Sequence, residues 1–393
     1  MNRRKLAAAV AVVALVAAAC SSGTPKASAN LPTSVGAGEG RLDLVAWAGY
    51  VVGGTGGEKV EGYDWVSQFE QESGCKTYVK VGGSSDEMVT LMKTGQYDGV
   101  SASGDASLRL VAGGDVSPVN FDLIPNYKDV FSGLKGQSYN TVGGLGYGVP
   151  HGRGANLLAW RSDIVTPDPD SWGVVFDANS PYKGKVTAYD SPIYIADAAV
   201  YLKATKPELK ITNPYALDDA QFKAAVDLLK AQRGAIGEYW SDATKQIQSF
   251  TSGTTVIGTT WQYQVNTMAT ATPAPPIKAI KPKEGATGWS DTWMIASKAK
   301  HPNCMYKWMD YILSPAANAA VTVYFGEAPV TAKACVEAEK LSPGHCTAFH
   351  AEDEAYFKDV YYWSTPQKDC GDSRGSVCKD YSEWTKAWTE IKG

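Results

Sequence analysis

Residues that could bind a small molecule recur where predicted strands end. Aromatic, hydroxyl and acidic side chains gather in six short segments, which are residues 47–50, 84–85, 101–105, 189–190, 261–263 and 289–291. Ligands of open α/β sheets bind beyond the carboxyl ends of the strands, so these segments are the predicted walls of a cleft. The chain also contains 12 Trp and 21 Tyr among its 393 residues, and a cleft lined with rings would use some of them.

The sequence lacks the common motifs of catalysis. The glycine runs at 53–57 and 143–146 are not followed by the Lys-Ser/Thr pair of a phosphate-binding loop. No Ser-His-Asp or HExxH spacing occurs, and four histidines provide little acid–base chemistry near neutral pH. A zinc site is disfavoured because His345 and His350 have no regular spacing with a CxxC pair. We therefore expect a binding protein that is not an enzyme and needs neither cofactor nor metal, with a secreted hydrolase as the remote alternative.

Alternating strands and helices predict an α/β fold with two lobes. Strands are expected at 42–47, 77–81 and 97–100, and helices at 62–73, 84–94 and 105–112. This β-α-β-α-β order predicts a parallel sheet with helices on both faces. A second αβ region follows, with helices near 195–203 and 218–233 and a strand at 255–258. Segments within 147–160 and 293–296 are predicted to cross between the lobes. Lobe 1 would then comprise 41–150 and 289–333, and lobe 2 would comprise 151–288 and 334–393.

The first 40 residues predict export and attachment to a membrane. Three basic residues precede an apolar run at 6–19, which is shorter than the roughly 20 residues of a membrane-spanning helix and is typical of a secretory signal (residues 1–19). Cys20 follows small residues at the end of this run, as in a bacterial lipobox, although Ala17 stands where Leu or Val is usual. Residues 20–40 are predicted to be a flexible tether, and a lipid on Cys20 would hold the protein at the outer face of the cell membrane. A plain signal peptide is the alternative.

Six further cysteines indicate an oxidising compartment, because an even number of cysteines suits disulfide bonds. Two pairs flank short turns, Cys335 with Cys346 and Cys370 with Cys378. These pairs leave Cys75 to bond with Cys304. Six cysteines allow many pairings, so the assignment rests on proximity in the sequence alone.

Several motifs resemble those of a known family. They are Ala46-Trp47-Ala48-Gly49-Tyr50, Tyr97-Asp98 with Val100 and Ser103, Ser171-Trp172-Gly173 with Tyr182-Lys183-Gly184, Trp261, and Gly288-Trp289-Ser290-Asp291. In their order and spacing over residues 42–334, the chain is similar to the spermidine/putrescine-type periplasmic binding proteins of ABC importers. The resemblance implies a Venus-flytrap fold, a ligand that carries amines, and a partner permease with its ATPase. A net charge of −4 provides no electrostatic argument for nucleic-acid binding. We expect the protein to be a monomer.

The same resemblance assigns roles to residues of the predicted cleft. The set comprises Trp47, Tyr50, Trp261 and Trp289 as walls, Ser103 beside them, Asp291 as the anchor of an ammonium group, and Asp190 as a second acidic position. Aromatic faces attract an ammonium ion and also stack on methylene chains. A carboxylate then fixes the amine through charge-assisted hydrogen bonds.

Four positions depart from the pattern of the family. Ile193 stands where a second carboxylate is usual after Asp190, and Arg153 stands where an aromatic residue is frequent. Asp105 and Glu327 replace residues that are commonly aromatic and would restore acidity. Arg153 would repel a polyamine if it faced the cleft, whereas it would suit a carboxylate. The expected ligand is therefore a polyamine such as putrescine or spermidine, with a zwitterion such as a γ-amino acid as the alternative.

Overall fold

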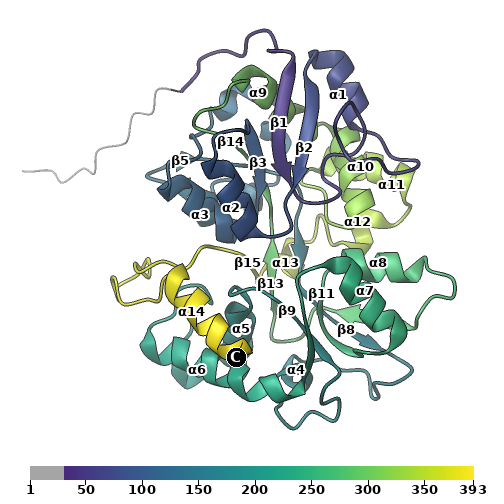
Figure 1. Ribbon diagram of the computed structural model, residues 1–393, viewed down its shortest axis with the longest axis vertical. Coiled ribbons are helices and arrows are strands. Elements are labelled where there is room, and N and C mark those ends of the chain that lie inside the picture. Colours follow the sequence, from purple (N-terminus) through teal and green to yellow (C-terminus); the bar gives the residue numbers. More distant parts are fainter. Residues whose placement is uncertain (1–30) are drawn as a thin grey trace, which may run out of the picture.

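The computed structural model describes residues 31–393, which form two lobes, one above the other in Figure 1. Each lobe has a central five-stranded sheet flanked by helices. Short strands connect the lobes, so the predicted two-lobed α/β architecture is confirmed. The predicted signal segment and the lipid-anchor residue Cys20 lie outside the described residues.

The sheet of the upper lobe has the strand order β2-β1-β3-β14-β6. Its strands are β1 (Arg41–Ala46), β2 (Lys76–Val81), β3 (Gly99–Ala102), β14 (Thr292–Ile295) and β6 (Val149–Pro150). β1 runs parallel to β2 and β3, whereas β14 is antiparallel to β3 and β6. Strands β4 (Thr141–Val142) and β5 (Leu145–Gly146) form a separate hairpin. The helices of this lobe are α1 (Val66–Ser73), α2 (Ser85–Lys93), α3 (Gly104–Ala112), α9 (Pro302–Ile312), α10 (Pro315–Phe325), α11 (Ala332–Leu341) and α12 (His345–Ala348).

The sheet of the lower lobe has the strand order β10-β9-β11-β8-β12. Its strands are β8 (Leu157–Arg161), β9 (Val186–Tyr189), β10 (Ile236–Trp240), β11 (Ile257–Thr260) and β12 (Ile277–Ile280). β9 runs parallel to β10 and β11, and β8 is antiparallel to β11 and β12. The helices are α4 (Gly173–Phe176), α5 (Tyr194–Thr205), α6 (Asp219–Gln232), α7 (Ala243–Ser252), α8 (Gln262–Ala269) and α14 (Tyr381–Lys392). The sequence pattern did not predict β10, β12 or α14.

Local sequence explains where several helices begin. Ser84 accepts a hydrogen bond from the backbone N–H of Glu87 and caps α2. Asp218 and Gln221 form a capping box at the start of α6. Asp242 accepts hydrogen bonds from two backbone N–H groups at the start of α7. These caps fix the loops that come directly before the helices, and one of those loops reaches the cleft described below.

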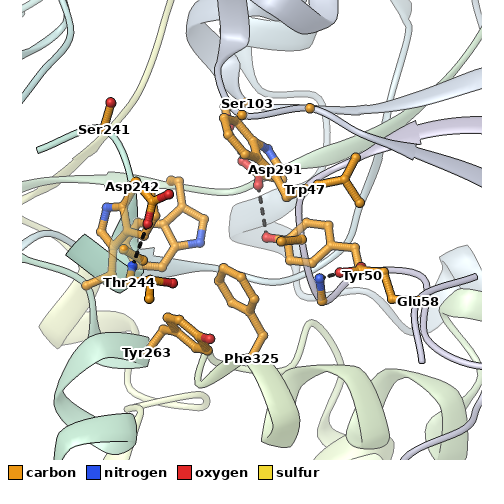
Figure 2. Close-up of a pocket in the computed structure, with 18 of the residues that line it drawn as sticks. Trp47, Tyr50, Glu58, Ser103, Ser241, Asp242, Thr244, Tyr263, Asp291 and Phe325 are labelled. Carbon is orange, nitrogen blue, oxygen red and sulfur yellow. Dashed lines mark hydrogen bonds between the residues drawn. The ribbon is translucent and has the colours of Figure 1, made fainter. Parts of the chain in front are cut away.

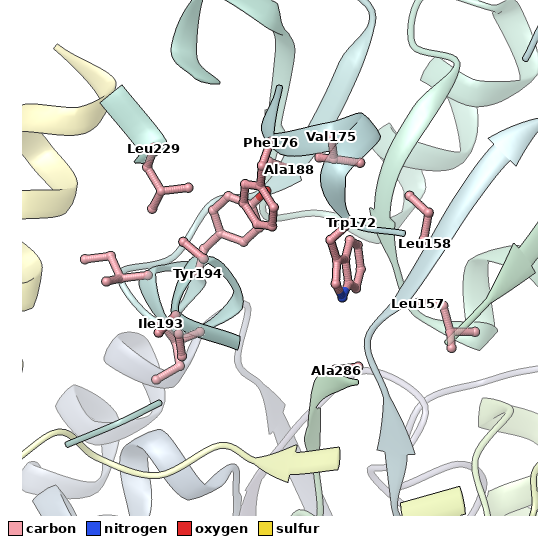
Figure 3. Packing of buried hydrophobic residues seen from close by; sticks show 14 of the residues in the cluster. Leu157, Leu158, Trp172, Val175, Phe176, Ala188, Ile193, Tyr194, Leu229 and Ala286 are labelled. Carbon is pink, nitrogen blue, oxygen red and sulfur yellow. The ribbon is translucent and has the colours of Figure 1, made fainter. Parts of the chain in front are cut away.

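A large apolar core supports the lower lobe. Trp172, Phe176 and Tyr194 pack together with Leu229 of α6 (Figure 3), and all four side chains are buried. The rings of Phe176 and Tyr194 stack with their centroids 6.0 Å apart. This packing gives α5 and the adjoining strands a fixed position, so the loops at the strand ends are held in place.

The lobes meet at a set of crossing segments. The chain passes from β6 to β7 (Gly154–Ala155) and returns from β13 (Ala286–Trp289) into β14. Strand β13 pairs with β7 and with β15 (Val360–Tyr362), which follows the short helix α13 (Glu354–Phe357). The backbones of Arg153 and Ala328 exchange hydrogen bonds of 3.1 and 2.9 Å, which brings the segment after α10 against the first crossing. Several residues near positions 151–155, 289–291 and 327 therefore sit where the lobes join.

The three disulfides have the predicted pairings, Cys75–Cys304, Cys335–Cys346 and Cys370–Cys378. The first of them joins the start of β2 to α9 within the upper lobe. Helix α11, which begins near the predicted boundary at residue 334, packs against α10, whereas α14 packs against α6. The residue boundaries of the two lobes stay a prediction.

Candidate ligand-binding cleft

A cleft of about 370 Å³ opens between the lobes. Figure 2 shows its lining from both sides, with Trp47, Tyr50 and Ser103 from the upper lobe and Asp242 and Thr244 from the lower lobe. The lining residues are Trp47, Ala48, Gly49, Tyr50, Glu58, Val81, Gly82, Gly83, Ser103, Ser241, Asp242, Ala243, Thr244, Trp261, Tyr263, Trp289, Asp291, Tyr324, Phe325 and Trp363. The predicted cleft at the strand ends is therefore present.

Eight of the twenty lining residues carry aromatic rings. Trp261, at the start of α8, has its ring centroid 5.8 Å from that of Trp289 and 6.5 Å from that of Trp363. Across the cleft, Tyr263 stacks on Phe325 at 5.6 Å. Rings packed against one another in this way keep their faces at fixed angles, so they form a rigid, apolar surface for a ligand.

Asp291 lies at the floor of the cleft, in the crossing between β13 and β14. Ser103 Oγ donates a 2.6 Å hydrogen bond to Asp291 Oδ1, and the hydroxyl of Tyr50 donates one of 2.9 Å to Oδ2 (Figure 2). The side chain is nearly inaccessible to water, and this burial raises the pKa of Asp291 to about 7, although the two hydrogen bonds oppose the shift. The carboxyl group is thus held rigidly and is paired with no positive side chain among the described residues.

Two further acids line the cleft. Glu58 accepts a 2.7 Å hydrogen bond from the backbone N–H of Gly49, and partial burial raises its pKa. Asp242 accepts from the backbone N–H groups of Thr244 and Lys245 at 2.8 and 3.2 Å. Among the lining residues that the structure describes there is no Lys, Arg or His. The cleft is therefore acidic and aromatic.

Six of the residues predicted to bind the ligand line the cleft together: Trp47, Tyr50, Ser103, Trp261, Trp289 and Asp291. Glu327 lies behind them, fully buried. Its Oε2 is 3.5 Å from the Tyr50 hydroxyl and 3.4 Å from Trp289 Nε1. Glu327 therefore contacts the walls of the cleft and is absent from its lining.

Three predicted residues lie elsewhere. Arg153 is buried on another side of the hinge, where its guanidinium bonds to Glu354 and to the carbonyl of Ala351, both at 2.8 Å. Asp190 accepts hydrogen bonds from Lys392 Nζ at 2.6 Å and from Trp388 Nε1 at 3.0 Å, so α14 draws it away from the cleft.

Asp105 points into the upper lobe, where the hydroxyl of Ser85 donates to it at 2.9 Å. Its side chain is buried, and this burial raises its pKa. Asp105 is therefore not a lining residue, although Ser103, two positions before it, is one.

Several lining residues were not predicted from the sequence. Asp242 follows β10 and Trp363 follows β15, and neither strand had been predicted. The strand-end rule would have found both residues, had the strands been recognised. Glu58, Tyr324 and Phe325 lie in a loop or at a helix end and carry no comparable sequence signal.

One cluster outside the cleft has ligand atoms close enough for a metal ion. Asp43, Asp98 and His301 each offer an atom within 4.8 Å of the others. The oxygens of Asp98 already accept from the backbone N–H groups of Asp43, Lys300 and His301, at 2.8 to 2.9 Å. These contacts make Asp98 a structural acid that ties β1 to the segment before α9.

Comparison with known proteins identifies the family. The family model described as "Bacterial extracellular solute-binding protein" matches residues 64–342. The chain belongs to this family. It is therefore a solute-binding protein of a transport family that acts outside the cytoplasm. Among residues 31–393, no helix combines the length and hydrophobicity needed to cross a membrane.

Individual relatives of this solute-binding protein carry more specific names. It is 24% identical over 263 residues to the putrescine/cadaverine-binding protein of Pseudomonas aeruginosa. The aligned region covers 64% of this chain and 71% of that relative. It is 25% identical over 338 residues to spermidine/putrescine-binding periplasmic protein 1 of Haemophilus influenzae, covering 84% of each. Among solved structures, a putative spermidine/putrescine ABC transporter from Listeria monocytogenes matches with a TM-score of 0.70 at 17% identity, over 90% of this chain and 99% of that chain. This last likeness supports the fold.

Proposed function

We propose that this protein captures a small aliphatic polyamine, such as putrescine or spermidine, and delivers it to the permease of an ABC importer. The observation that carries the proposal is the Asp291 carboxyl group, held by Ser103 and Tyr50 at the floor of a ring-lined cleft. The named relatives bind putrescine, cadaverine or spermidine, which is consistent with that chemistry.

The cleft suits an organic cation with a methylene chain. An ammonium group over an aromatic face gains about 0.5–2 kcal/mol, and a carboxylate that accepts its N–H groups adds a charge-assisted hydrogen bond. Trp261 and Trp289 supply faces, and Asp291 supplies the acceptor. Glu58 and Asp242 add acidic groups elsewhere along the wall, where further amines of the same ligand would bind.

A zwitterionic ligand fits this cleft less well. Its carboxylate would need a positive partner, and Arg153 is engaged with Glu354 away from the lining. The N-terminus of α7, which also reaches the cleft, already has Asp242 as its cap. A carboxylate on the ligand would therefore lie near acidic side chains of the cleft, so the cleft favours amines that carry no carboxylate.

The proposal includes the protein's setting. We infer that Cys20 carries a lipid, that the segment after it tethers the protein to the outer face of the membrane, and that the protein acts as a monomer with a permease and its ATPase. The end of the predicted flexible tether (residues 20–40) is fixed on α9, because the backbone N–H of Gly36 donates to Asn303 and the Glu39 carboxylate accepts from the backbone N–H groups of Asn303 and Cys304. Closure of the two lobes would enclose the amine. We propose no catalytic role, because the chain belongs to a family of solute-binding proteins.

A thermal-shift screen of the purified protein tests the ligand class. We expect putrescine or spermidine to raise the unfolding temperature, because a ligand at a hundredfold excess over its Kd stabilises the folded state by roughly 3 kcal/mol. γ-Aminobutyrate and sugars should give no shift. Chromatography of the amine after incubation should recover it unchanged. A shift with a sugar or a γ-amino acid in place of the amines would refute the proposal.

A further inference from the structure

Two buried carboxyl groups share one hydroxyl beneath the cleft. The Tyr50 hydroxyl lies 2.9 Å from Asp291 Oδ2 and 3.5 Å from Glu327 Oε2. Asp291 is 3% exposed and Glu327 is 0% exposed. A tyrosine hydroxyl has one proton, so it donates to one carboxylate at a time, and the shorter distance favours Asp291.

The groups around Glu327 are neutral. Trp289 Nε1 lies 3.4 Å from Glu327 Oε2, and His151 Nε2 lies 3.4 Å from Oε1. His151 Nδ1 accepts a 2.8 Å hydrogen bond from Trp293 Nε1, which leaves the ring proton on Nε2, facing the acid. Burial lowers the pKa of His151 to about 3, so the imidazole is uncharged at neutral pH.

In the part of the chain that the structure describes, the other segments packed around Asp291 and Glu327 place no positive charge beside these two side chains. His345 Nε2 contacts the backbone carbonyl of Glu327 at 3.0 Å, not its side chain. The guanidinium of Arg153 is bonded to Glu354. Three further titratable groups lie close enough to interact electrostatically with Asp291. They are Asp105, Tyr139 and Tyr189. Each of these is neutral or negative.

Two ionised carboxylates in such a place would repel each other without a counter-ion. Removal from water penalises each charge, and two close acids then titrate as a pair that keeps a proton to a higher pH. Burial, together with the charge of Asp291, raises the pKa of Glu327 well above its ordinary value. An ammonium group bound at Asp291 would supply the missing positive charge.

We propose that the Asp291–Glu327 pair holds a proton in the ligand-free protein and releases it when an ammonium ion binds, so that capture of the solute is coupled to proton release. An O–H bond of the pair breaks, the proton passes to water or buffer, and the resulting carboxylate pairs with the ammonium group. The inference rests on the proposed function. It makes Glu327 a positioning residue that acts through Tyr50 and Trp289, and it requires affinity to rise with pH across the neutral range.

Calorimetry of putrescine binding in two buffers counts the protons released. At pH 7, phosphate and Tris differ strongly in ionisation enthalpy, so the difference between the observed enthalpies gives the number of protons. We expect about half a proton or more per bound putrescine for the unaltered protein, and less for Glu327→Gln. Asp197→Asn is the matched control, because burial also raises the pKa of Asp197 to about 7, yet this acid lies outside the cleft lining. Equal enthalpies in both buffers for the unaltered protein overturn the proposal.

A second measurement needs no ligand. An acid whose folded pKa is raised keeps a proton that the unfolded chain has lost, so the folded state loses stability as pH rises from about 4.5 through the folded pKa. The unfolding temperature should therefore fall between pH 5 and pH 8, and it should fall less steeply in Glu327→Gln. Parallel profiles would rule out a proton on this pair. The two proposals can also fail separately. If the profile of Glu327→Gln is flatter but putrescine does not bind to the unaltered protein, the pair holds a proton, whereas the proposed amine-binding function and the coupling of proton release to amine binding are both wrong.

Discussion

Ser103 Oγ lies 2.6 Å from Asp291 Oδ1, although the two residues are 188 positions apart in the chain. Ser103 precedes α3 in the upper lobe, and Asp291 lies in the crossing that joins β13 to β14. The bond therefore fixes the acidic floor of the cleft relative to the sheet of one lobe. A ligand held by Asp291 contacts a group that is already oriented, which reduces the entropy lost on binding.

Asp291→Asn should weaken putrescine binding without changing the shape of the cleft. The amine would lose a charge-assisted hydrogen bond of roughly 1.5–3 kcal/mol, which corresponds to a tenfold to hundredfold rise in Kd. Calorimetry at pH 8 measures the change. Asp190→Asn is the control, because Asp190 is bonded to Lys392 and lies outside the lining. Equal effects of the two changes would contradict the assignment of Asp291.

Trp261→Leu should also weaken binding, because it removes an aromatic face and keeps an apolar side chain. The loss of one cation–π contact of about 0.5–2 kcal/mol predicts a Kd that rises roughly 2- to 30-fold. Tyr78→Leu removes a ring of β2 that contacts Arg41 of β1, outside the cleft, and should leave the Kd unchanged. If the amine bound as tightly to Trp261→Leu, this ring would not be a wall of the site.

Arg153→Ala should lower stability and leave putrescine affinity within about threefold. The side chain is 1% exposed, stacks on Phe357 at 3.8 Å and bonds to Ala351 and Glu354. Its loss leaves a buried carbonyl unsatisfied and a cavity, at a cost of about 1–3 kcal/mol. Urea unfolding and calorimetry separate the two effects. A large loss of affinity at unchanged stability would mean that Arg153 contacts the ligand.

The disulfides should differ in their contribution to stability. Cys75 and Cys304 are 229 residues apart, and Cys370 and Cys378 are 8 apart. Chain entropy predicts a loss of about 5 kcal/mol when both members of the long-range pair become Ala, against roughly 2–3 kcal/mol for the short-range pair. Denaturant unfolding of the two double variants gives the comparison. A larger loss from the short-range pair would show that loop entropy does not dominate here.

Cys20→Ala should abolish lipid attachment and release the protein into the medium. Its thiol is the predicted site of the lipid, and one or more buried acyl chains supply the membrane affinity. Metabolic labelling with a fatty-acid probe, followed by fractionation of cells and medium, measures both effects. Cys75→Ala provides a control, since this cysteine is in a disulfide and should not affect labelling. Persistent labelling of Cys20→Ala would remove the lipoprotein assignment.

The sequence by itself determined the strands of the first lobe and the residues that follow them. Strand and helix patterns depend on neighbours close in the chain, so the ends of β1 and β11 could be located, and with them Trp47 and Trp261. Asp291 was found because it comes just before the predicted crossing segment at 293–296, which corresponds to β14. The resemblance to polyamine-binding proteins rested on those same positions. The cysteine pairs could be proposed because two of them close short loops.

Only the tertiary structure decided which polar residues face the cleft. Successive side chains of an extended crossing point in opposite directions, so spacing alone did not reveal that Arg153 turns toward Glu354. Asp190 is drawn away by α14, and that helix lies about 200 residues later in the chain. Trp363 enters the cleft because β15 pairs with β13, a contact between segments far apart in sequence. Such choices depend on packing between distant segments, and no local pattern encodes them.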